Sequence, residues 1–139
     1  MKRALLDVNI VLDVLLDRGP HAKASAAVWA AIERGAVEGM LAAHALTTIH
    51  YLVRKDRDSP DARRTLAALL RVFAVAAVDG AVLRQALQFS WPDFEDSVTA
   101  AAAQSAGCDA IVTRDPRGFP GSPVRVLLPE VAAALLAQP

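Results

Sequence analysis

Acidic side chains recur beside short apolar segments of this sequence. Asp7 follows the apolar residues 4–6, Asp115 follows the segment DAIVTR, and Asp96 lies at the start of an alanine-rich segment. Ligands of open α/β sheets bind at the carboxyl ends of the strands, so we expect these three carboxylates to share one site. Gathered carboxylates repel one another unless a cation lies between them. Oxygen ligands without a histidine or cysteine pattern predict Mg²⁺ or Mn²⁺, and hence phosphoryl chemistry.

Each of these polar residues also has a purely structural explanation. Asp7 is placed to cap the helix that follows it, while Asp93 and Asp96 stand three residues apart at a helix start, where the helix dipole favours negative charge. Asp115 precedes a proline, as turn-forming aspartates commonly do, and Asn9 is a typical cap or turn residue. Capping does not require acids from three segments to converge. The site prediction therefore depends on the sheet that brings them together.

Apolar segments alternate as strands and helices along the chain. We predict strands at residues 3–7, 38–42, 72–75, 109–113 and 124–127. We predict helices at residues 9–16, 20–34, 44–55, 79–89, 93–106 and 129–137, and one that begins at Pro60 with Ser59 as its cap. Strands separated by helices need parallel crossovers, which predicts a three-layer α/β/α fold with a central, mainly parallel sheet of about five strands. The first and fourth strands are the expected neighbours where the strand order reverses.

The composition predicts one globular domain spanning residues 1–139. Hydrophobic residues make up 54% of the chain, enough to bury a single core. Fifteen basic residues balance fifteen acidic ones, which argues against a generally basic nucleic-acid coat but not against a local basic groove. The single cysteine, Cys108, excludes an internal disulfide and a cysteine-rich zinc site, and favours a reducing, cytoplasmic setting. We expect no signal peptide and no membrane helix, which would need roughly 20 apolar residues.

The order of the sequence motifs resembles a known family. The segments LLDVN, ALTTIHYLVRK, DFEDSVTAAAA, AIVTRDPRGF and VRVLLPEVAAAL follow one another as in the PIN-domain ribonucleases, especially the small VapC-like toxins of type II toxin-antitoxin pairs. The most specific parts are the opening D-x-N and the pairing of a helix-start aspartate with TRD and the following Phe119. The resemblance implies that Asp7, Asp96 and Asp115 bind the metal. It further implies supporting residues: Asn9 and Thr113 as hydrogen-bond partners of the acids, and Asp93 as an additional acid.

One position departs from the family pattern. Most PIN ribonucleases carry a glutamate near the start of the third helix, and the segment ALTTIHYL places Thr48 there. Thr48 is neutral and too short to bind a metal as glutamate does. It is either a helix-start hydroxyl without further role or a group that orients water at the metal. The site has one negative charge fewer in either case, which weakens divalent-metal binding or leaves Asp93 to compensate.

The resemblance implies a Mg²⁺- or Mn²⁺-dependent endoribonuclease that hydrolyses phosphodiester bonds in single-stranded or loop RNA. It implies a cognate antitoxin as partner and no membrane association. The candidate RNA-binding residues are Arg54, Lys55, Arg114 and Arg117, although each is more simply explained as a solvated surface charge. The sequence does not give the oligomeric state, but apolar residues on two helices leave room for a homodimer face: Val28, Trp29, Ile32, Leu66, Leu69 and Leu70.

Two other classes of protein share the feature of acids at strand ends. Phosphotransfer receivers and haloacid-type phosphatases also place acids at strand ends, but they need a lysine late in the chain. Here the lysines are Lys2, Lys23 and Lys55, and the opening motif is D-x-N where the phosphatases have D-x-D. The alternative that remains is a PIN-like module that binds RNA or a protein partner without cleavage.

Overall fold

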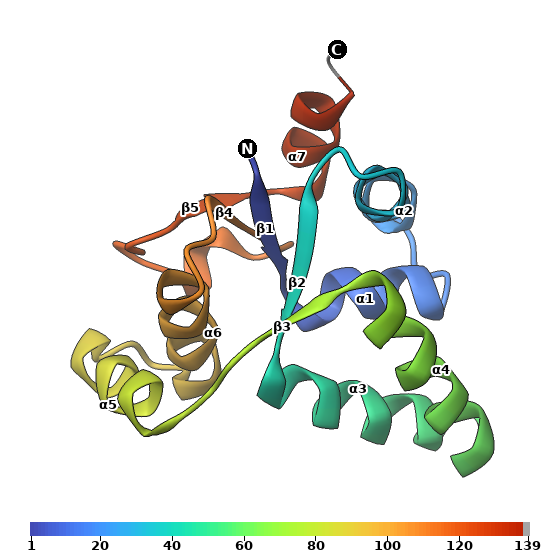
Figure 1. Ribbon diagram of the computed structural model, residues 1–139, viewed down its shortest axis with the longest axis horizontal. Coiled ribbons are helices and arrows are strands. Elements are labelled where there is room, and N and C mark those ends of the chain that lie inside the picture. The colour runs from blue at the N-terminus through green and yellow to red at the C-terminus, as the bar shows by residue number, and fades with distance from the viewer. Residues whose placement is uncertain (138–139) are drawn as a thin grey trace.

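Five short apolar segments pair as a single parallel sheet in the computed structural model, which describes residues 1–137 (Figure 1). All neighbouring strands are parallel, and their order across the sheet is β3-β2-β1-β4-β5. The predicted fold class is therefore confirmed, as is the predicted contact between the first and fourth strands. The strands are β1 (Arg3–Leu6), β2 (Glu38–Ala42), β3 (Ala74–Ala76), β4 (Ala110–Val112) and β5 (Arg125–Leu127).

Helices cover both faces of the sheet (Figure 1). One face packs against α1 (Val8–Leu15), α2 (Ala22–Glu33), α3 (Ala43–Asp56), α4 (Ser59–Val72) and α7 (Pro129–Leu136). The other face packs against α5 (Gly80–Phe89) and α6 (Phe94–Ser105), and a 3₁₀ turn, η1 (Pro116–Gly118), follows β4. Within residues 1–137, none of the helices combines the length and apolar character needed to cross a membrane.

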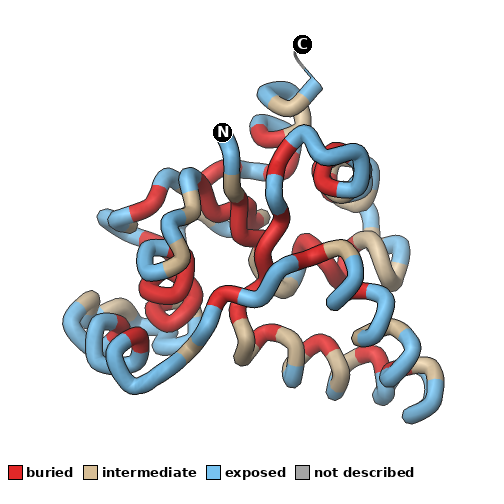
Figure 2. Tube along the Cα trace, viewed as in Figure 1, coloured by how far each residue is buried: buried red, intermediate tan, exposed pale blue. Residues whose placement is uncertain are grey.

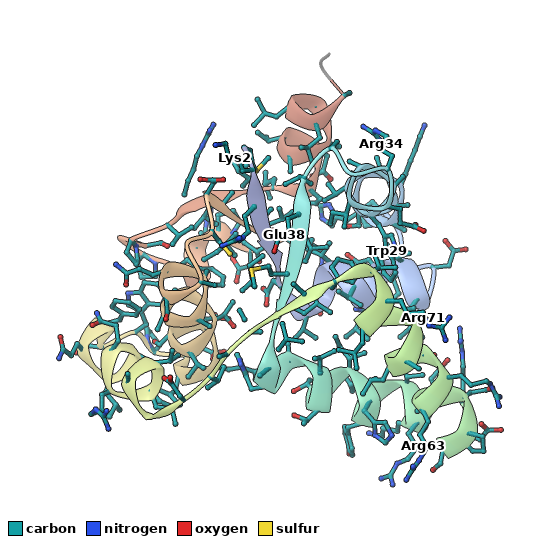
Figure 3. All side chains as sticks on the ribbon, viewed as in Figure 1. Lys2, Trp29, Arg34, Glu38, Arg63 and Arg71 are labelled. Atoms are coloured by element: carbon teal, nitrogen blue, oxygen red, sulfur yellow. The ribbon has the colours of Figure 1, made fainter. Side chains whose placement is uncertain are left out.

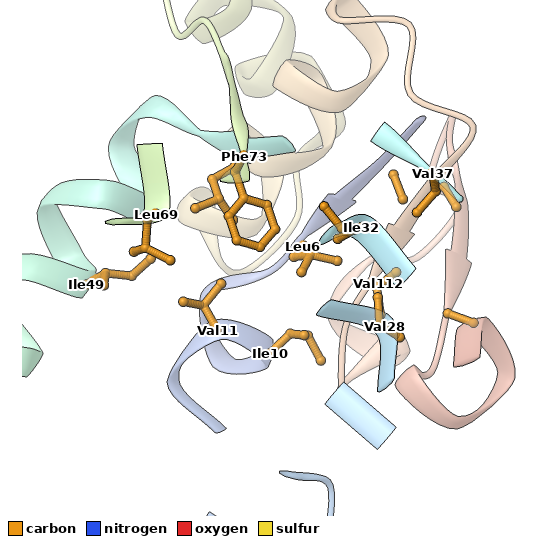
Figure 4. Packing of buried hydrophobic residues seen from close by; sticks show 14 of the residues in the cluster. Leu6, Ile10, Val11, Val28, Ile32, Val37, Ile49, Leu69, Phe73 and Val112 are labelled. Carbon is orange, nitrogen blue, oxygen red and sulfur yellow. The ribbon is translucent and has the colours of Figure 1, made fainter. Parts of the chain in front are cut away.

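Alternation along the strands divides the core into two layers. Leu6 and Val112 lie in the cluster under α1 and α2, whereas their chain neighbours Leu5 and Ile111 lie in the cluster under α6. Successive side chains of a strand point to opposite faces, so a strand buried on both faces must be apolar at every position. Figure 4 shows the first cluster from close by, and Figure 2 shows the buried strands at the centre of the molecule.

The predicted element boundaries lie within two residues of the observed ones. The cap of α4 was predicted wrongly: Asp58 caps it by accepting a hydrogen bond from the backbone N–H of Asp61 at 2.8 Å, and Ser59 is the first helical residue. Val72, predicted as the start of the third strand, ends α4 instead. The turn η1 was not predicted.

The expected dimer face is largely interior. Val28, Ile32 and Leu69 are buried in the first core cluster, and Trp29 and Leu66 pack against that cluster. Of the predicted set only Leu70 is exposed. The apolar periodicity of these helices therefore reflects their packing against the sheet and against each other.

The backbone of Gly39 on β2 lies close to core side chains of α2 and of the residue that follows α4. A Cβ atom added there would lie 2.7 Å from Ile32 Cδ1 and 2.9 Å from Phe73 Cδ1. We expect Gly39→Ala to lower the free energy of unfolding by about 1–3 kcal/mol, because overpacking forces neighbouring side chains from their rotamers. Chemical denaturation measures the change. The double variant Gly39→Ala/Ile32→Ala should lose less free energy of unfolding than the sum of the losses in the two single variants. A loss equal to that sum would contradict the predicted clash.

Candidate active site

The pairing of β1 with β4 places Asp7 beside Thr113. Leu6 is in register with Val112, and the backbone N–H of Asp7 donates to the Val112 carbonyl at 2.9 Å. The Thr113 hydroxyl donates to Asp7 Oδ2 at 2.9 Å, while the Val8 N–H donates to Oδ1 at 2.9 Å. Asp7 therefore caps α1 and also faces the carboxyl edge of the sheet. Asp7 can therefore be a helix cap and a site residue at the same time, and the predicted hydrogen bond with Thr113 is present.

The start of α6 supplies two further acids. Asp93 caps the helix by accepting a hydrogen bond from the backbone N–H of Asp96 at 3.1 Å. Asp96 itself stands in the first turn and is half-buried. Its carboxylate lies against η1, because a Cβ atom added to Gly118 would be 2.7 Å from Asp96 Oδ2 and 3.6 Å from Asp115 Oδ2. The backbone of η1 thus brings the Asp96 and Asp115 carboxylates to one place. We call Asp7, Asp93, Asp96 and Asp115 the acid cluster.

Contacts among three aromatic rings connect the start of α6 with the loop after β4, the two segments that carry Asp96 and Asp115. Trp91, which precedes α6, stacks on Phe89 with ring centroids 4.9 Å apart. It also meets Phe119 edge to face, with centroids 5.8 Å apart. Phe119 directly follows η1 and is buried. Because such aromatic pairs bury large apolar areas in fixed geometry, they hold the loop of Asp115 against the start of α6.

The electrostatics of the cluster show carboxylates acting on one another. The pKa of Asp96 is raised to about 7, first by burial and then by the charges of Asp93, Asp7, Glu95 and Asp115. Burial also raises the pKa of Asp7, against the lowering effect of the hydrogen bonds from Thr113 and Val8. Burial and the gathering of like charges both raise the pKa of a carboxyl group, and a cation would offset both effects.

His44 is a site residue that the sequence analysis missed. It stands in the first turn of α3, half-buried, with Nε2 3.4 Å from the Thr99 hydroxyl, and its charge lowers the pKa of Asp7. Burial lowers the pKa of His44 itself, which favours the neutral imidazole. Its Nδ1 is buried without a hydrogen-bond partner among residues 1–137. Thr48 lies one turn further on the same helix face, and His44 directly precedes the ALTTIH segment of residues 45–50.

The residues of the acid cluster have the right donor atoms for a divalent cation, but they are spaced too widely to enclose one. The acids offer oxygen donors, which suit Mg²⁺ or Mn²⁺, and their repulsion is of the kind a cation relieves. The buried Nδ1 of His44 is an additional polar atom without a partner in the described chain. Within residues 1–137, however, no three histidine, cysteine, aspartate or glutamate side chains stand close enough to enclose an ion. The carboxylates repel one another without being drawn to ligating distance.

Other predicted site residues lie outside the acid cluster or face different partners. The Asn9 amide oxygen accepts a hydrogen bond from Arg18 at 3.4 Å, and Arg114 forms an ion pair with Asp13 at 3.2 Å. Arg117 is exposed on η1, next to Gly118. Arg54 and Lys55 are in the last turn of α3, ten residues from His44 and thus about 15 Å further along the helix axis. The roles of these residues stay predictions.

The raised pKa of Asp96 predicts a pH-dependent effect of Asp96→Asn on metal-free protein. The folded state holds the Asp96 proton up to about pH 7, whereas the unfolded chain releases it near the ordinary value of 3.8. Ionised Asp96 therefore destabilises the fold increasingly as pH rises between these values, and the effect is complete above about pH 7. Asp96→Asn should be more stable than wild type by about 1–2 kcal/mol at pH 8, with solvent screening taken into account.

Urea denaturation in EDTA at pH 8 and at pH 4 measures this difference. The advantage of the variant should shrink towards pH 4, where both side chains are neutral in the folded state. Asp58→Asn is the matched control, because Asp58 caps α4 at the far end of the α3–α4 pair. An equal stability difference at both pH values would contradict the repulsion inferred for the cluster.

Comparison with known proteins agrees with this architecture. Residues 3–117 match the family model described as "PIN domain". No curated protein sequence matches the chain. The DNA-bound VapBC structure from Salmonella typhimurium aligns with a TM-score of 0.70 at 16% identity, covering 93% of this chain and 99% of that one. The FitAcB structure from Neisseria gonorrhoeae aligns with a TM-score of 0.69 at 20% identity, covering 91% and 97% of the two chains.

A third similar structure is VapC20 from Mycobacterium tuberculosis, described as a toxin that cleaves the sarcin-ricin loop. It aligns with a TM-score of 0.61 at 17% identity and covers 78% of this chain and 86% of that one. At such low identity these structures show the shared fold. Together with the family model, which spans most of the sequence from β1 to η1, they lead to one conclusion: the chain belongs to the PIN-domain family.

Proposed function

We propose that this protein, acting as a single domain over residues 1–139, is a metal-dependent endoribonuclease. The observation that supports it most is the convergence of the acid cluster, in which burial and then the charges of the neighbouring carboxylates raise the pKa of Asp96 to about 7. A purely structural set of helix caps has no need to gather carboxylates from β1, α6 and η1. The location agrees, since ligands of open α/β sheets bind where the strand order reverses, here between β1 and β4.

In this proposal Asp7, Asp96 and Asp115 hold Mg²⁺ or Mn²⁺. The ion would supply positive charge that stabilises the oxygens of the reacting phosphate and makes water more acidic. Thr113 fixes the Asp7 carboxylate by its 2.9 Å hydrogen bond. Asp93 orients the first turn of α6, on which Asp96 stands, through its bond to the Asp96 N–H. Arg117, exposed on η1, would contact the RNA backbone, and Arg54 and Lys55 would contact only a longer RNA.

In place of the glutamate found in most family members, the first two turns of α3 provide uncharged polar groups. Thr48 supplies a hydroxyl there, and His44, one turn earlier, supplies a neutral imidazole near Asp7. In our proposal these two groups hold water by hydrogen bonding and add no negative charge. The metal should accordingly bind more weakly than in a relative with the glutamate, since a hard cation gains most from carboxylate charge.

We further propose a toxin role with a cognate antitoxin. The similar structures from Salmonella typhimurium and Neisseria gonorrhoeae are described as VapBC and FitAcB complexes, and another from Klebsiella pneumoniae is described as a toxin-antitoxin complex. An antitoxin segment that presents an arginine would find carboxylates in the acid cluster, where charge-assisted hydrogen bonds are strong.

A non-catalytic PIN-like module is the second candidate function. It is favoured by Thr48 and by the spacing of the acids, which do not enclose an ion among residues 1–137. Titration calorimetry with Mn²⁺ separates the two candidates. Binding that is lost in Asp7→Asn supports the nuclease, while absence of binding in wild type supports the module.

Replacement of the proposed metal ligands should abolish cleavage and leave the fold intact. Asp7→Asn and Asp96→Asn remove charge but keep side-chain size, and asparagine also caps helices well. We expect the rate of single-stranded RNA hydrolysis in Mn²⁺ to fall at least about 100-fold in each variant, since a removed ligand group costs several kcal/mol at the transition state. The measurement is cleavage of a labelled RNA, with circular dichroism melting as the test of folding.

Asp58→Asn is again the matched control, because Asp58 is a helix-capping aspartate outside the acid cluster. It should cleave RNA at the wild-type rate. Full nuclease turnover in both Asp7→Asn and Asp96→Asn would exclude the catalytic assignment. Loss of cleavage in Asp58→Asn as well would point to general destabilisation.

The toxin role predicts a growth phenotype that depends on the acid cluster. Expression of the wild-type protein alone should slow bacterial growth, and expression of Asp7→Asn at equal level should not. Co-expression with the protein encoded by the adjacent small reading frame should restore growth, and the two proteins should purify together. Growth curves with matched immunoblots test this. A wild type that is harmless at high expression and purifies alone would contradict the toxin role.

A further inference from the structure

A buried carboxylate lies on α1 beside the acid cluster and has no role so far. Asp13 is entirely buried, although α1 is otherwise apolar on its inner face. Two arginines bracket it: Arg18 Nε is 3.4 Å from Oδ1, and Arg114 Nε is 3.2 Å from Oδ2. Each oxygen of the one carboxylate thus faces one guanidinium. A buried carboxylate is strongly destabilising without such partners, so this pairing fixes both arginines.

The two guanidinium groups are held at one end only. The Nε atoms of Arg18 and Arg114 are both buried and meet Asp13 as ion pairs without hydrogen-bond geometry, whereas their side chains as a whole are 40% and 30% exposed. Arg18 Nη2 donates one long hydrogen bond of 3.4 Å to Asn9. Within residues 1–137, no protein acceptor is bonded to the terminal amino groups of Arg114. The amino groups are therefore left as donors for something outside the chain.

This arrangement sits directly beside the acid cluster. Arg114 lies between Thr113, which binds Asp7, and Asp115. Arg18 reaches Asn9, two residues after Asp7. Two positive charges and the one negative charge of Asp13 leave a local excess of one positive charge. The arginine pair is thus a small cationic surface at the rim of an anionic site.

We propose that Arg18 and Arg114, fixed by Asp13, form a binding subsite for a backbone phosphate of single-stranded RNA. This inference rests on the proposed ribonuclease function and names how its substrate is held. The guanidinium fork matches phosphate geometry, and the charge of Asp13 already draws each arginine to this place, which lowers the side-chain entropy lost on binding. A polymeric substrate with one phosphate at the acid cluster places the next phosphates alongside, where the excess positive charge would receive one.

The competing explanation is that the arginines only neutralise Asp13. That explanation requires the Nε contacts but not the free, partly exposed amino groups. The two explanations differ in their consequences for RNA. A structural pair changes stability alone, whereas a phosphate subsite changes RNA affinity and its dependence on salt.

The test is fluorescence anisotropy with a labelled single-stranded RNA in EDTA at low salt. Arg18→Gln and Arg114→Gln should each raise the Kd about tenfold and lower the slope of log Kd against log salt by about 0.7, the value for one single-strand phosphate contact. Because either variant leaves Asp13 less well paired, Asp13→Asn/Arg114→Gln removes both charges and protects the fold. The double variant should keep the tenfold loss. Arg63→Gln, on the outer surface of α4 (Figure 3), is the control and should bind as wild type.

Cleavage kinetics in Mn²⁺ give a second readout. The arginine variants should raise KM with kcat little changed, because a remote phosphate contact binds ground state and transition state alike. Unchanged Kd and KM alongside a lower melting temperature would overturn the subsite and leave the nuclease proposal standing. Reduced RNA binding in a protein that cleaves no RNA would support the subsite and overturn the nuclease. A wild type that binds no RNA would overturn the subsite.

Discussion

The parallel pairing of β1 with β4 is the constraint on which the site depends. Its register sets Leu6 opposite Val112, so the residues that follow, Asp7 and Thr113, must emerge together at the carboxyl edge. The 2.9 Å hydrogen bond between their side chains follows directly from that register. A slip of one residue would move Leu6 to the core layer that now holds Leu5 and would separate Asp7 from Thr113. The core clusters on both faces of β1 oppose any such slip, so the hydrophobic packing maintains the polar geometry.

Repulsion at this edge has to be offset by the surrounding structure. Asp7 and Asp93 accept hydrogen bonds from backbone N–H groups as the caps of α1 and α6, which stabilises their negative charge. The Phe89–Trp91–Phe119 contacts hold the Asp115 loop against α6. Asp96 has no such compensation, and it is the group whose pKa rises to about 7. A site of this kind keeps its affinity for positive charge because the scaffold, rather than a resident counter-charge, stabilises it.

The sequence predicted the elements closely and the side-chain partners less well. Apolar segments and caps are local signals, so the strands and most helices could be inferred from them, whereas the contact of Thr113 with Asp7 was implied only by the family resemblance. His44 was missed because its role depends on α3 beginning beside the end of β1. Asp13 was missed because one acid in an apolar helix gives no sign of arginines five and 101 residues away. Arg54 and Lys55 stay predictions, since the helix predicted over residues 44–55 already places them at the end opposite His44.

The zero net charge of the chain conceals a sharp separation of charge. The acid cluster is anionic, and beside it Arg18 and Arg114 outnumber the one acid that they share. Within the Debye length of about 8 Å at physiological salt, such local imbalance matters more than the sum over the protein. A metal at the acids and a phosphate at the arginines would neutralise the two parts separately. Thr48 bears on this division as well, since threonine adds no negative charge to the acid cluster at the position where most PIN ribonucleases carry a glutamate.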